Sequence, residues 1–322
     1  PLAVVVDFIV GPADNCFGDM KSFYRNIICV LVFLGCYVSA FGASTPLFWK
    51  AEKEGKTIYL MGTIHIGSDD LYPLPDVVYD AMEESQTLFV EVDLRGLDKA
   101  ALGETISSLS FMPDASLFDL LDSDTWFALD KVLDKYQLQL IQLDHLQPWY
   151  FVYLLSGLPA ARGDYDPELG VDLYLMDLAD REDVSVVSLE TLDFQLKMFS
   201  DWSLEDQIEL LEGSLTEDDV SMDSLTALHD AWKDGDEAAI ISQEEASEGA
   251  SEIMDAFWTK LIDERNHSML ESILKEMKTL DTAFVAVGAM HMVGDHGLAA
   301  LLREDGFTVA LLSGNTGEVT HD

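Results

Sequence analysis

The chain of 322 residues has little positive charge and almost no cysteine. Only 18 lysines and arginines stand against 60 aspartates and glutamates, which gives a formal net charge of -42 at pH 7. Because so much negative charge repels phosphate backbones, we expect no nucleic-acid partner. The 48% of hydrophobic residues and the mean hydropathy of +0.12 exclude general disorder and provide enough apolar mass for a buried core.

All three cysteines, Cys16, Cys29 and Cys36, lie before residue 44. If residues 1–43 are removed when the protein matures, the mature chain has no cysteine. Disulfides, thiolate nucleophiles and cysteine metal sites are then excluded from it. Several common motifs are also missing: His-Glu-x-x-His, Gly-x-Ser-x-Gly, the Walker loop and Gly-x-Gly-x-x-Gly. The sequence therefore gives no support for assigning the chain to the ordinary zincins, serine hydrolases, nucleotide hydrolases or dinucleotide-binding enzymes.

Residues 20–43 have the pattern of a secretory signal peptide. A methionine is followed by Lys21 and Arg25, then by the apolar run 27–38 and by small residues. The run is shorter than the roughly 20 apolar residues that a membrane span needs. We therefore expect cleavage before residue 44, no stable membrane span afterwards, and a periplasmic or secreted protein.

Residues 1–19 do not fit in front of a signal peptide, so we expect them to be a non-native upstream extension and Met20 to be the true start. Lipoprotein anchoring at Cys36 is the less favoured interpretation, because a bulky Phe33 stands three residues before it. Residues 47–312 contain no linker rich in proline, glycine or serine, which favours a single domain over residues 44–322.

Short apolar runs typical of strands alternate with helical spacing at both ends of the chain, which indicates a parallel sheet. The middle is mostly helical, with Ser116 to Tyr136 at helical spacing and with Ser203 and Thr216 as helix starts. We predict an α/β fold: a central mixed, largely parallel sheet covered by helices, with the helical middle region acting as cover or lid. The strand-like runs are 57–61, 87–90, 184–189 and 283–287.

The spacing Gly-x-x-His follows two of these runs, as Gly62-Thr63-Ile64-His65 and as Gly288-Ala289-Met290-His291. A glycine at the end of a strand lets the backbone turn sharply. Ligands of open α/β sheets bind beyond the carboxyl ends of the strands. We therefore expect both histidines to point back over the same edge of the sheet.

Glu91 and Glu190 directly follow the other two runs and reach the same edge. Two imidazoles with one or two carboxylates form an open site for a divalent metal ion and a water. The ion lowers the pKa of the water and a carboxylate takes its proton, so the chemistry would be hydrolytic. The alternative is structural: hydrogen-bonded histidines, solvent-facing carboxylates and, at Arg265, a helix-face arginine paired with a nearby acid.

The two histidine segments are part of a series of ordered motifs between about residues 47 and 312. The other motifs are Leu47-Phe48-Trp49-Lys50, Phe89-Val90-Glu91, Gln147-Pro148-Trp149, Gly170-Val171-Asp172, Leu189-Glu190-Thr191 with Gln195, Trp232 with Gly235-Asp236, and Glu264-Arg265-Asn266. Through these motifs the chain resembles the TraB/GumN family, which is related to the Tiki proteases, ChaN-like haem-binding proteins and erythromycin esterases.

The resemblance implies a Tiki/ChaN-like fold with the histidines and glutamates in one pocket and, in the Tiki branch, a peptidase that depends on a divalent metal ion such as Mn or Co. The residues themselves leave the choice among Mn, Co and Zn open. The resemblance implies His65, His291 and Glu91 as metal ligands. It also implies Glu91, Glu190 and Arg265 as catalytic residues, with Arg265 steadying developing negative charge or fixing Glu91.

We therefore expect an exported metal-dependent hydrolase that acts on a peptide or small-molecule substrate. One alternative is a metal-independent esterase-type hydrolase, in which a glutamate orients a histidine that acts as general base. Another is a non-catalytic periplasmic module that binds haem, through a histidine, or a peptide.

Overall fold

The structure is a computed structural model that describes residues 46–93, 95–96, 98–162, 165–215, 222–245, 251–312 and 319–320. The predicted extension 1–19 and the predicted signal peptide 20–43 lie outside the described residues. So do the three cysteines and Thr216, the expected start of a helix. None of the described helices is long and apolar enough to cross a membrane.

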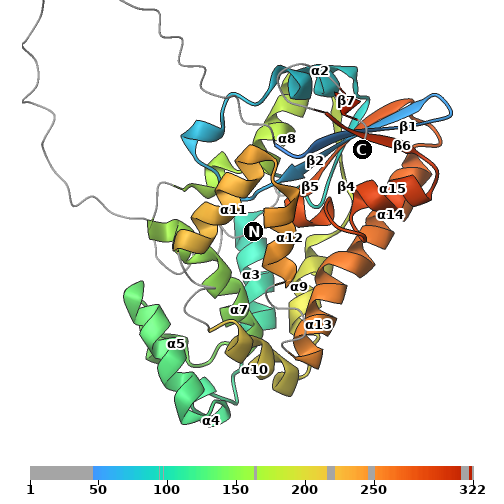
Figure 1. The fold of residues 1–322 in the computed structure, drawn as a ribbon. Helices are drawn as coiled ribbons and strands as arrows, with labels where there is room; N and C mark the ends of the chain where they lie inside the picture. The colour runs from blue at the N-terminus through green and yellow to red at the C-terminus, as the bar shows by residue number, and fades with distance from the viewer. Residues whose placement is uncertain are drawn as a thin grey trace, which may run out of the picture.

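The described strands form one mixed sheet in the order β4-β3-β5-β2-β1-β6-β7 (Figure 1). β2, β5, β3 and β4 run parallel to one another, whereas β1, β6 and β7 pair antiparallel. This confirms the predicted mixed α/β sheet, and the predicted site residues follow the strands of its parallel part. The strands are β1 (Phe48–Lys53), β2 (Lys56–Thr63), β3 (Thr87–Val90), β4 (Ser185–Ser188), β5 (Thr282–Gly288), β6 (Thr308–Leu312) and β7 (Val319–Thr320).

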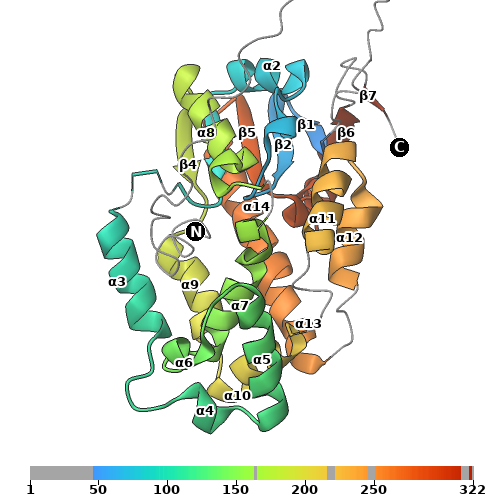
Figure 2. The same cartoon turned by 90° about the vertical axis from the view of Figure 1, so that its left-hand side faces the viewer.

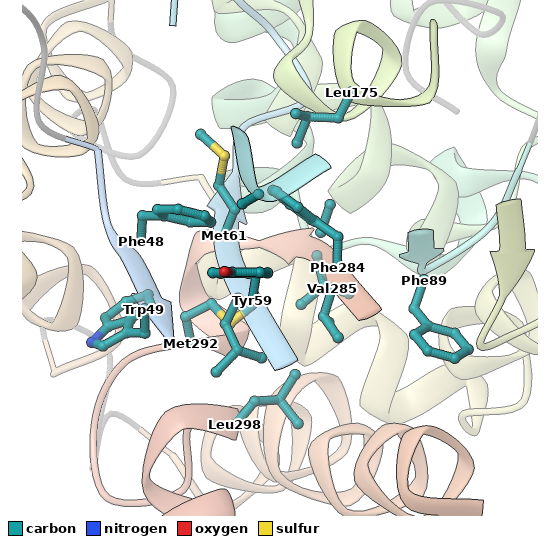
Figure 3. Packing of buried hydrophobic residues seen from close by; sticks show 14 of the residues in the cluster. Phe48, Trp49, Tyr59, Met61, Phe89, Leu175, Phe284, Val285, Met292 and Leu298 are labelled. Carbon is teal, nitrogen blue, oxygen red and sulfur yellow. The ribbon is translucent and has the colours of Figure 1, made fainter. Parts of the chain in front are cut away.

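Helices cover both faces of this sheet, which explains why its central strands are continuous apolar runs. In β5, residues 283–287 are at most 1% exposed. Figure 3 shows Leu175 of α8 on one face of the sheet and Leu298 of α15 on the other, with Phe284 and Val285 between them. The helices packed on the sheet include α2 (Asp76–Glu84), α8 (Val171–Arg181), α14 (Glu264–Glu276) and α15 (Leu298–Glu304).

A second hydrophobic core lies within the helical middle of the chain, below the sheet in Figures 1 and 2. Trp149, Phe151 and Leu211 are at most 1% exposed there. The helices of this region are α3 (Lys99–Ser110), α4 (Leu117–Leu120), α5 (Ser123–Lys135), α6 (Leu140–Leu143), α7 (Pro148–Gly157), α9 (Leu192–Ser200), α10 (Leu204–Gly213) and α13 (Glu252–Trp258). Whether the two cores belong to a single domain stays a prediction.

Short helices connect these elements. They are η1 (Asp69–Leu71), η2 (Pro159–Arg162), η3 (Pro167–Leu169), η5 (Ala289–His291) and the π-helical turn η4 (Thr259–Asp263), which leads directly into α14. The remaining α-helices, α11 (Met222–Asp234) and α12 (Glu237–Glu245), lie beside the sheet, and Trp232 of α11 donates a 2.7 Å hydrogen bond to the Gly62 carbonyl.

The segment from Ser116 to Tyr136 is not one continuous helix. Leu121 is extended after α4, and the side chain of Asp122 accepts a 2.8 Å hydrogen bond from the Thr125 N–H, which starts α5 afresh. The expected start at Ser203 is confirmed, because its side chain accepts a hydrogen bond from the Asp206 N–H at the beginning of α10.

Candidate functional site

The two histidine segments leave the sheet side by side. β2 and β5 are parallel neighbours, and Thr63 lies opposite Gly288 in their register. Glu91 follows β3, which pairs with the other side of β5, and Glu190 comes two residues after the end of β4. The structure thus brings the predicted side chains to one carboxyl edge of the parallel strands, where open α/β sheets bind ligands.

The glycines of the two segments serve close approach rather than the sharp turn that the sequence suggested. Positive φ is found at other glycines of the described chain, but not at Gly62 or Gly288. A Cβ on Gly62 would lie 2.9 Å from the Cα of Ala289, so β2 can pack on η5 only without a side chain there. A Cβ on Gly288 would lie 3.3 Å from Glu91 Oε1.

Arg265 joins the two glutamates. Its Nη2 donates to Glu91 Oε2 at 2.6 Å and to Glu190 Oε2 at 2.8 Å, and its Nε donates to Glu190 Oε1 at 2.9 Å. The side chains of Arg265, Glu190 and Glu91 are 5%, 3% and 12% exposed. Arg265 is therefore not an ordinary surface arginine, because it pairs with two carboxylates in a largely dry setting.

Gln195 of α9 completes this group. Its Nε2 lies 3.1 Å from Glu91 Oε2 and 3.1 Å from Glu190 Oε2 and donates to both. The other oxygen of Glu91, Oε1, accepts a 2.8 Å hydrogen bond from the Gly288 N–H. Each oxygen of Glu91 therefore has a donor that fixes the orientation of the carboxylate.

Asn266 sets the chemical form of His291. Its Nδ2 donates to the His296 carbonyl at 2.8 Å, which turns its Oδ1 toward His291 Nδ1 at 2.7 Å. His291 Nδ1 must then carry the proton and donate, so that Nε2 keeps its lone pair. This Nε2 lies 3.9 Å from Glu91 Oε1. The contribution of His296 is its carbonyl, and its ring is exposed.

His65 has a carboxylate partner of its own. Its Nδ1 lies 3.1 Å from Asp172 Oδ2, and the side chains are 40% and 19% exposed. Asp172 stands in the first turn of α8, and this helix is tied to the histidine loop because the Val171 N–H donates to the Ile64 carbonyl at 2.9 Å. Asp172 Oδ1 is buried without a hydrogen-bond partner.

These surroundings shift the pKa values of the two histidines in opposite directions. Burial, assisted by Arg265 and His65 and opposed by Glu91, lowers the pKa of His291 to about 4, so its ring is neutral at pH 7. Desolvation also lowers the pKa of His65, but Asp172 and Glu91 outweigh it and raise that pKa to about 8.

The electrostatics also keep Glu91 charged. Burial raises the pKa of Glu91, but His291, Arg265, His65 and the Gly288 N–H lower it by more, so the pKa lies well below its usual range. Glu91, Arg265 and the two histidines thus interact electrostatically, as expected for side chains at one edge of the sheet.

The donor chemistry of this group suits a divalent metal ion. The group contains the neutral imidazole of His291, the ionised carboxylate of Glu91 and the imidazole of His65. The Nδ1 atom of each ring is oriented by a neighbouring side chain, as is usual for histidine ligands of metal ions. The group is nevertheless not a closed cluster: within the described ranges, no three His, Cys, Asp or Glu side chains lie close enough together to hold a metal ion. The residues therefore fit a metal ion in donor type but do not form a complete ligand set.

No role was predicted for Asp172, Gln195 or Asn266, although each lies in a motif that carries the family resemblance. Their identity alone is unremarkable, because polar residues are common on helices. Their place in the motif series could have indicated a role. Asp172 ends the motif Gly170-Val171-Asp172, Asn266 directly follows Arg265, and Gln195 accompanies the motif of Glu190.

Comparison with known proteins identifies the family of the chain. The model of the TraB/PrgY/gumN family matches residues 47–311. An uncharacterized protein of Treponema pallidum (strain Nichols) is 21% identical over 202 residues, a match that covers 58% of this chain and only 58% of that protein. The uncharacterized protein YbaP of Escherichia coli (strain K12) is 25% identical over 258 residues, which is 76% of this chain and 87% of YbaP. No solved structure matches the chain.

Proposed function

Because the chain belongs to the TraB/PrgY/gumN family, we propose that it is a hydrolase that cleaves peptides with the help of a divalent metal ion. The observation that supports the proposal is that His65, His291 and Glu91 follow the neighbouring parallel strands β2, β5 and β3 at one edge of the sheet. Two imidazoles and one carboxylate are donors that Mn, Co and Zn accept. An ion bound there supplies a water molecule whose pKa is lowered toward neutrality.

In this proposal the remaining residues orient His65, His291 and Glu91 and balance the charge of the site. Glu190 is bound to Arg265 through both oxygens, so we assign it to holding the arginine rather than to accepting a proton. Arg265 fixes Glu91 and provides positive charge near the edge where negative charge develops. Asn266 keeps His291 Nε2 free, and Asp172 orients His65.

A metal-independent hydrolase is the second candidate, and the contacts of Glu91 favour it. Both oxygens of Glu91 already accept hydrogen bonds, from Arg265, Gln195 and the Gly288 N–H. In this case the neutral His291 acts as the general base, because its Nε2 has a free lone pair.

Metal analysis separates these candidates. Purified protein should contain close to one divalent ion per chain by elemental analysis, and His65→Ala and His291→Ala should each lose it while the circular dichroism spectrum stays unchanged. His145→Ala is the matched control, because this exposed histidine lies in the helical region and its Nδ1 bonds to the Ala115 carbonyl. Full metal content in both site variants would overturn the metal proposal.

An unbiased peptide-cleavage screen tests the hydrolase itself. Activity that disappears on exhaustive chelation and returns with Mn, Co or Zn supports the first candidate, whereas activity that survives chelation but is lost in His291→Ala supports the second. If the wild-type protein cleaves no peptide or ester, with or without added metal, both candidates fail.

We also propose that the protein is exported, on the basis of the signal-peptide pattern of residues 20–43. Expression of the precursor in a bacterium should release a periplasmic or secreted form. Amino-terminal sequencing of this form should begin at residue 41 or 44. An uncleaved protein that stays in the cytoplasm would contradict this.

A further inference from the structure

The segment that carries His65 packs closely against the chain before α8. We call residues 64–70 the histidine loop. The Gly67 N–H donates to the Asp166 carbonyl at 3.1 Å, and the Asp166 N–H donates to the Gly67 carbonyl at 2.8 Å. A Cβ on Gly67 would lie only 1.9 Å from the Leu169 carbonyl oxygen. Backbone contacts therefore fix this side of the histidine loop.

The helix α11 contacts the same loop through side chains. His229 Nε2 lies 2.8 Å from Ser68 Oγ, and Lys233 Nζ donates to Asp70 Oδ2. Ser68 and His229 are 9% and 5% exposed, so water competes little for the hydrogen bond between them. The histidine loop thus lies between a backbone contact and the side chains of one helix.

A third contact of α11 lies before the loop. Trp232 donates to the carbonyl of Gly62, the last residue but one of β2, at 2.7 Å. His229, Trp232 and Lys233 are three and four positions apart, so they share one face of α11. This face therefore contacts the chain on both sides of His65.

The order of the protons shows that His229 donates to Ser68. The hydrogen bond from Lys233 holds the pKa of Asp70 below its usual range, so Asp70 is ionised at pH 7 and can only accept. The hydroxyl of Ser68 donates to Asp70 Oδ1, and Ser68 Oγ accepts from His229 Nε2. Since His229 takes no proton from Ser68, the pair is a link between α11 and the loop rather than an activated nucleophile.

The His65 ring depends on its backbone for its position. The side chain is 40% exposed, so neighbouring atoms cover it only in part. Asp172 Oδ2 lies 3.1 Å from His65 Nδ1 and orients the ring. This contact to α8 can align the ring only while the histidine loop keeps its place.

From these contacts we propose that Ser68, His229 and Lys233 are positioning residues for His65. They hold the histidine loop against the chain before α8, so that the His65 ring stays beside Asp172 at the carboxyl edge of β2. The inference rests on the proposed function, because a hydrolase needs His65 in a fixed place. A misplacement of about 1 Å is enough to slow a reaction about 100-fold.

The test replaces His229 in the full chain. His229→Ala removes the donor to Ser68, whereas His229→Gln keeps one, because the glutamine Nε2 takes nearly the place of the histidine Nε2. Two readouts are independent of any reaction: hydrogen exchange of peptides covering residues 64–70, and the NMR signal of the His65 ring, assigned with His65→Gln. His229→Ala should speed the exchange by about tenfold or more and shift the His65 signal, and His229→Gln should restore both.

A double-mutant cycle shows whether Ser68 and His229 act through one contact. Ser68→Ala should speed exchange of the loop about as much as His229→Ala does. The double variant should add less than about twofold to either single variant, because both remove the same hydrogen bond.

Thr125→Val is the matched control. The Thr125 residue is also 9% exposed, and its hydroxyl donates to Glu212 Oε1 at 3.1 Å, but this contact joins α5 to α10 in the helical region. In urea denaturation the variant should lose about as much stability as Ser68→Ala. It should leave the exchange of the histidine loop and the His65 signal unchanged.

Cleavage kinetics connect the contact with the reaction. For any peptide that the wild-type protein cleaves, His229→Ala should lower kcat by about tenfold or more and change KM by less than about twofold, because the loss misplaces His65 rather than the bound peptide. His229→Gln should recover most of kcat, and Thr125→Val should keep all of it.

The outcomes separate this proposal from the proposed function. An unchanged His65 signal and unchanged exchange in His229→Ala would overturn the positioning role, whether or not the protein cleaves peptides. Full kcat in His229→Ala, or an equal response in Thr125→Val, would overturn it too. If the wild-type protein cleaves nothing while the His65 signal responds to His229→Ala and recovers in His229→Gln, the proposed function fails and the placement of His65 by α11 stands.

Discussion

Asn266 holds the His291 ring through one buried hydrogen bond of 2.7 Å. Asn266→Ala leaves Nδ1 of this ring without an acceptor, so we expect the free energy of unfolding to fall by about 1–3 kcal/mol. Urea denaturation measures this loss. His267→Ala is the control, because the neighbouring ring is exposed and its loss should change stability by no more than about 0.5 kcal/mol. Equal stability of the two variants would contradict the positioning role of Asn266.

Arg265 forms ion pairs with both glutamates, and its removal leaves two buried carboxylates without this cation. Arg265→Met should therefore lower the free energy of unfolding at pH 7 by about 3–5 kcal/mol. Lys197→Ala breaks the ion pair between Lys197 and Asp193, whose side chains are 49% and 62% exposed, and should lower the free energy of unfolding far less. Chemical denaturation of both variants gives the comparison, and similar losses would mean that the buried network contributes little.

The two histidines should shape the pH dependence of stability in opposite ways. The folded pKa of His291, about 4, lies below the unfolded value near 6.5, so its contribution is complete above pH 6.5 and is lost as the pH falls toward 4. The folded pKa of His65, about 8, lies above the unfolded value, so its contribution is complete below pH 6.5 and is lost as the pH rises through 8.

Denaturation of the metal-free protein across this range should therefore give a stability that falls in both directions from about pH 6.5. The variant His291→Gln should remove most of the acid-side decrease between pH 6.5 and 4, and His65→Gln most of the decrease between pH 6.5 and 8. Unchanged slopes in these variants would show that other groups control the profile.

Residues next to strands were the easiest part of the site to predict. Glu91 and His291 follow apolar runs directly or after a glycine, and the parallel arrangement of the strands then decides where they lie. Asp172, Gln195 and Asn266 were not predicted because each meets a partner from a distant segment, and nothing in its local sequence encodes that contact.

Among the elements, the contact between β2 and η5 depends on one missing side chain. Gly62→Ala would place a Cβ 2.9 Å from the Cα of Ala289, so we expect a loss of about 1–3 kcal/mol as the two segments separate. Gly96→Ala is the matched control, since nothing lies within 4 Å of its Cβ position and no left-handed φ is required. Thermal denaturation should show a lower melting temperature for the first variant alone.

The sequence predicted the existence of elements with a strong apolar period better than it predicted where they begin and end. The strand after β3, expected over 184–189, is β4 with only four residues, Ser185–Ser188, and it has an exposed face because it is the edge of the sheet. The sequence indicated a parallel sheet at both ends of the chain, but β6, near the C-terminus, pairs antiparallel with β1. The direction of a pairing depends on distant partners, which apolar periodicity does not reveal.

The whole molecule has a charge of -42, which repels itself in the compact state. Raising sodium chloride from about 50 mM to 1 M shortens the screening length and should raise the melting temperature, by about 2–4 °C for each 1 kcal/mol of relieved repulsion. Differential scanning calorimetry measures this change. The effect should shrink as the pH approaches the pI of about 4.1, and a salt-induced decrease at pH 7 would mean that attractive ion pairs dominate.

β2 and β5 are neighbours in the sheet although one lies near the start of the described chain and the other near its end. A polypeptide that is still being synthesised has β2 long before it has β5. The candidate site therefore cannot assemble until residue 291 has been synthesised. Any chain that terminates before Thr282 lacks β5 and should not form this site, whatever part of it folds.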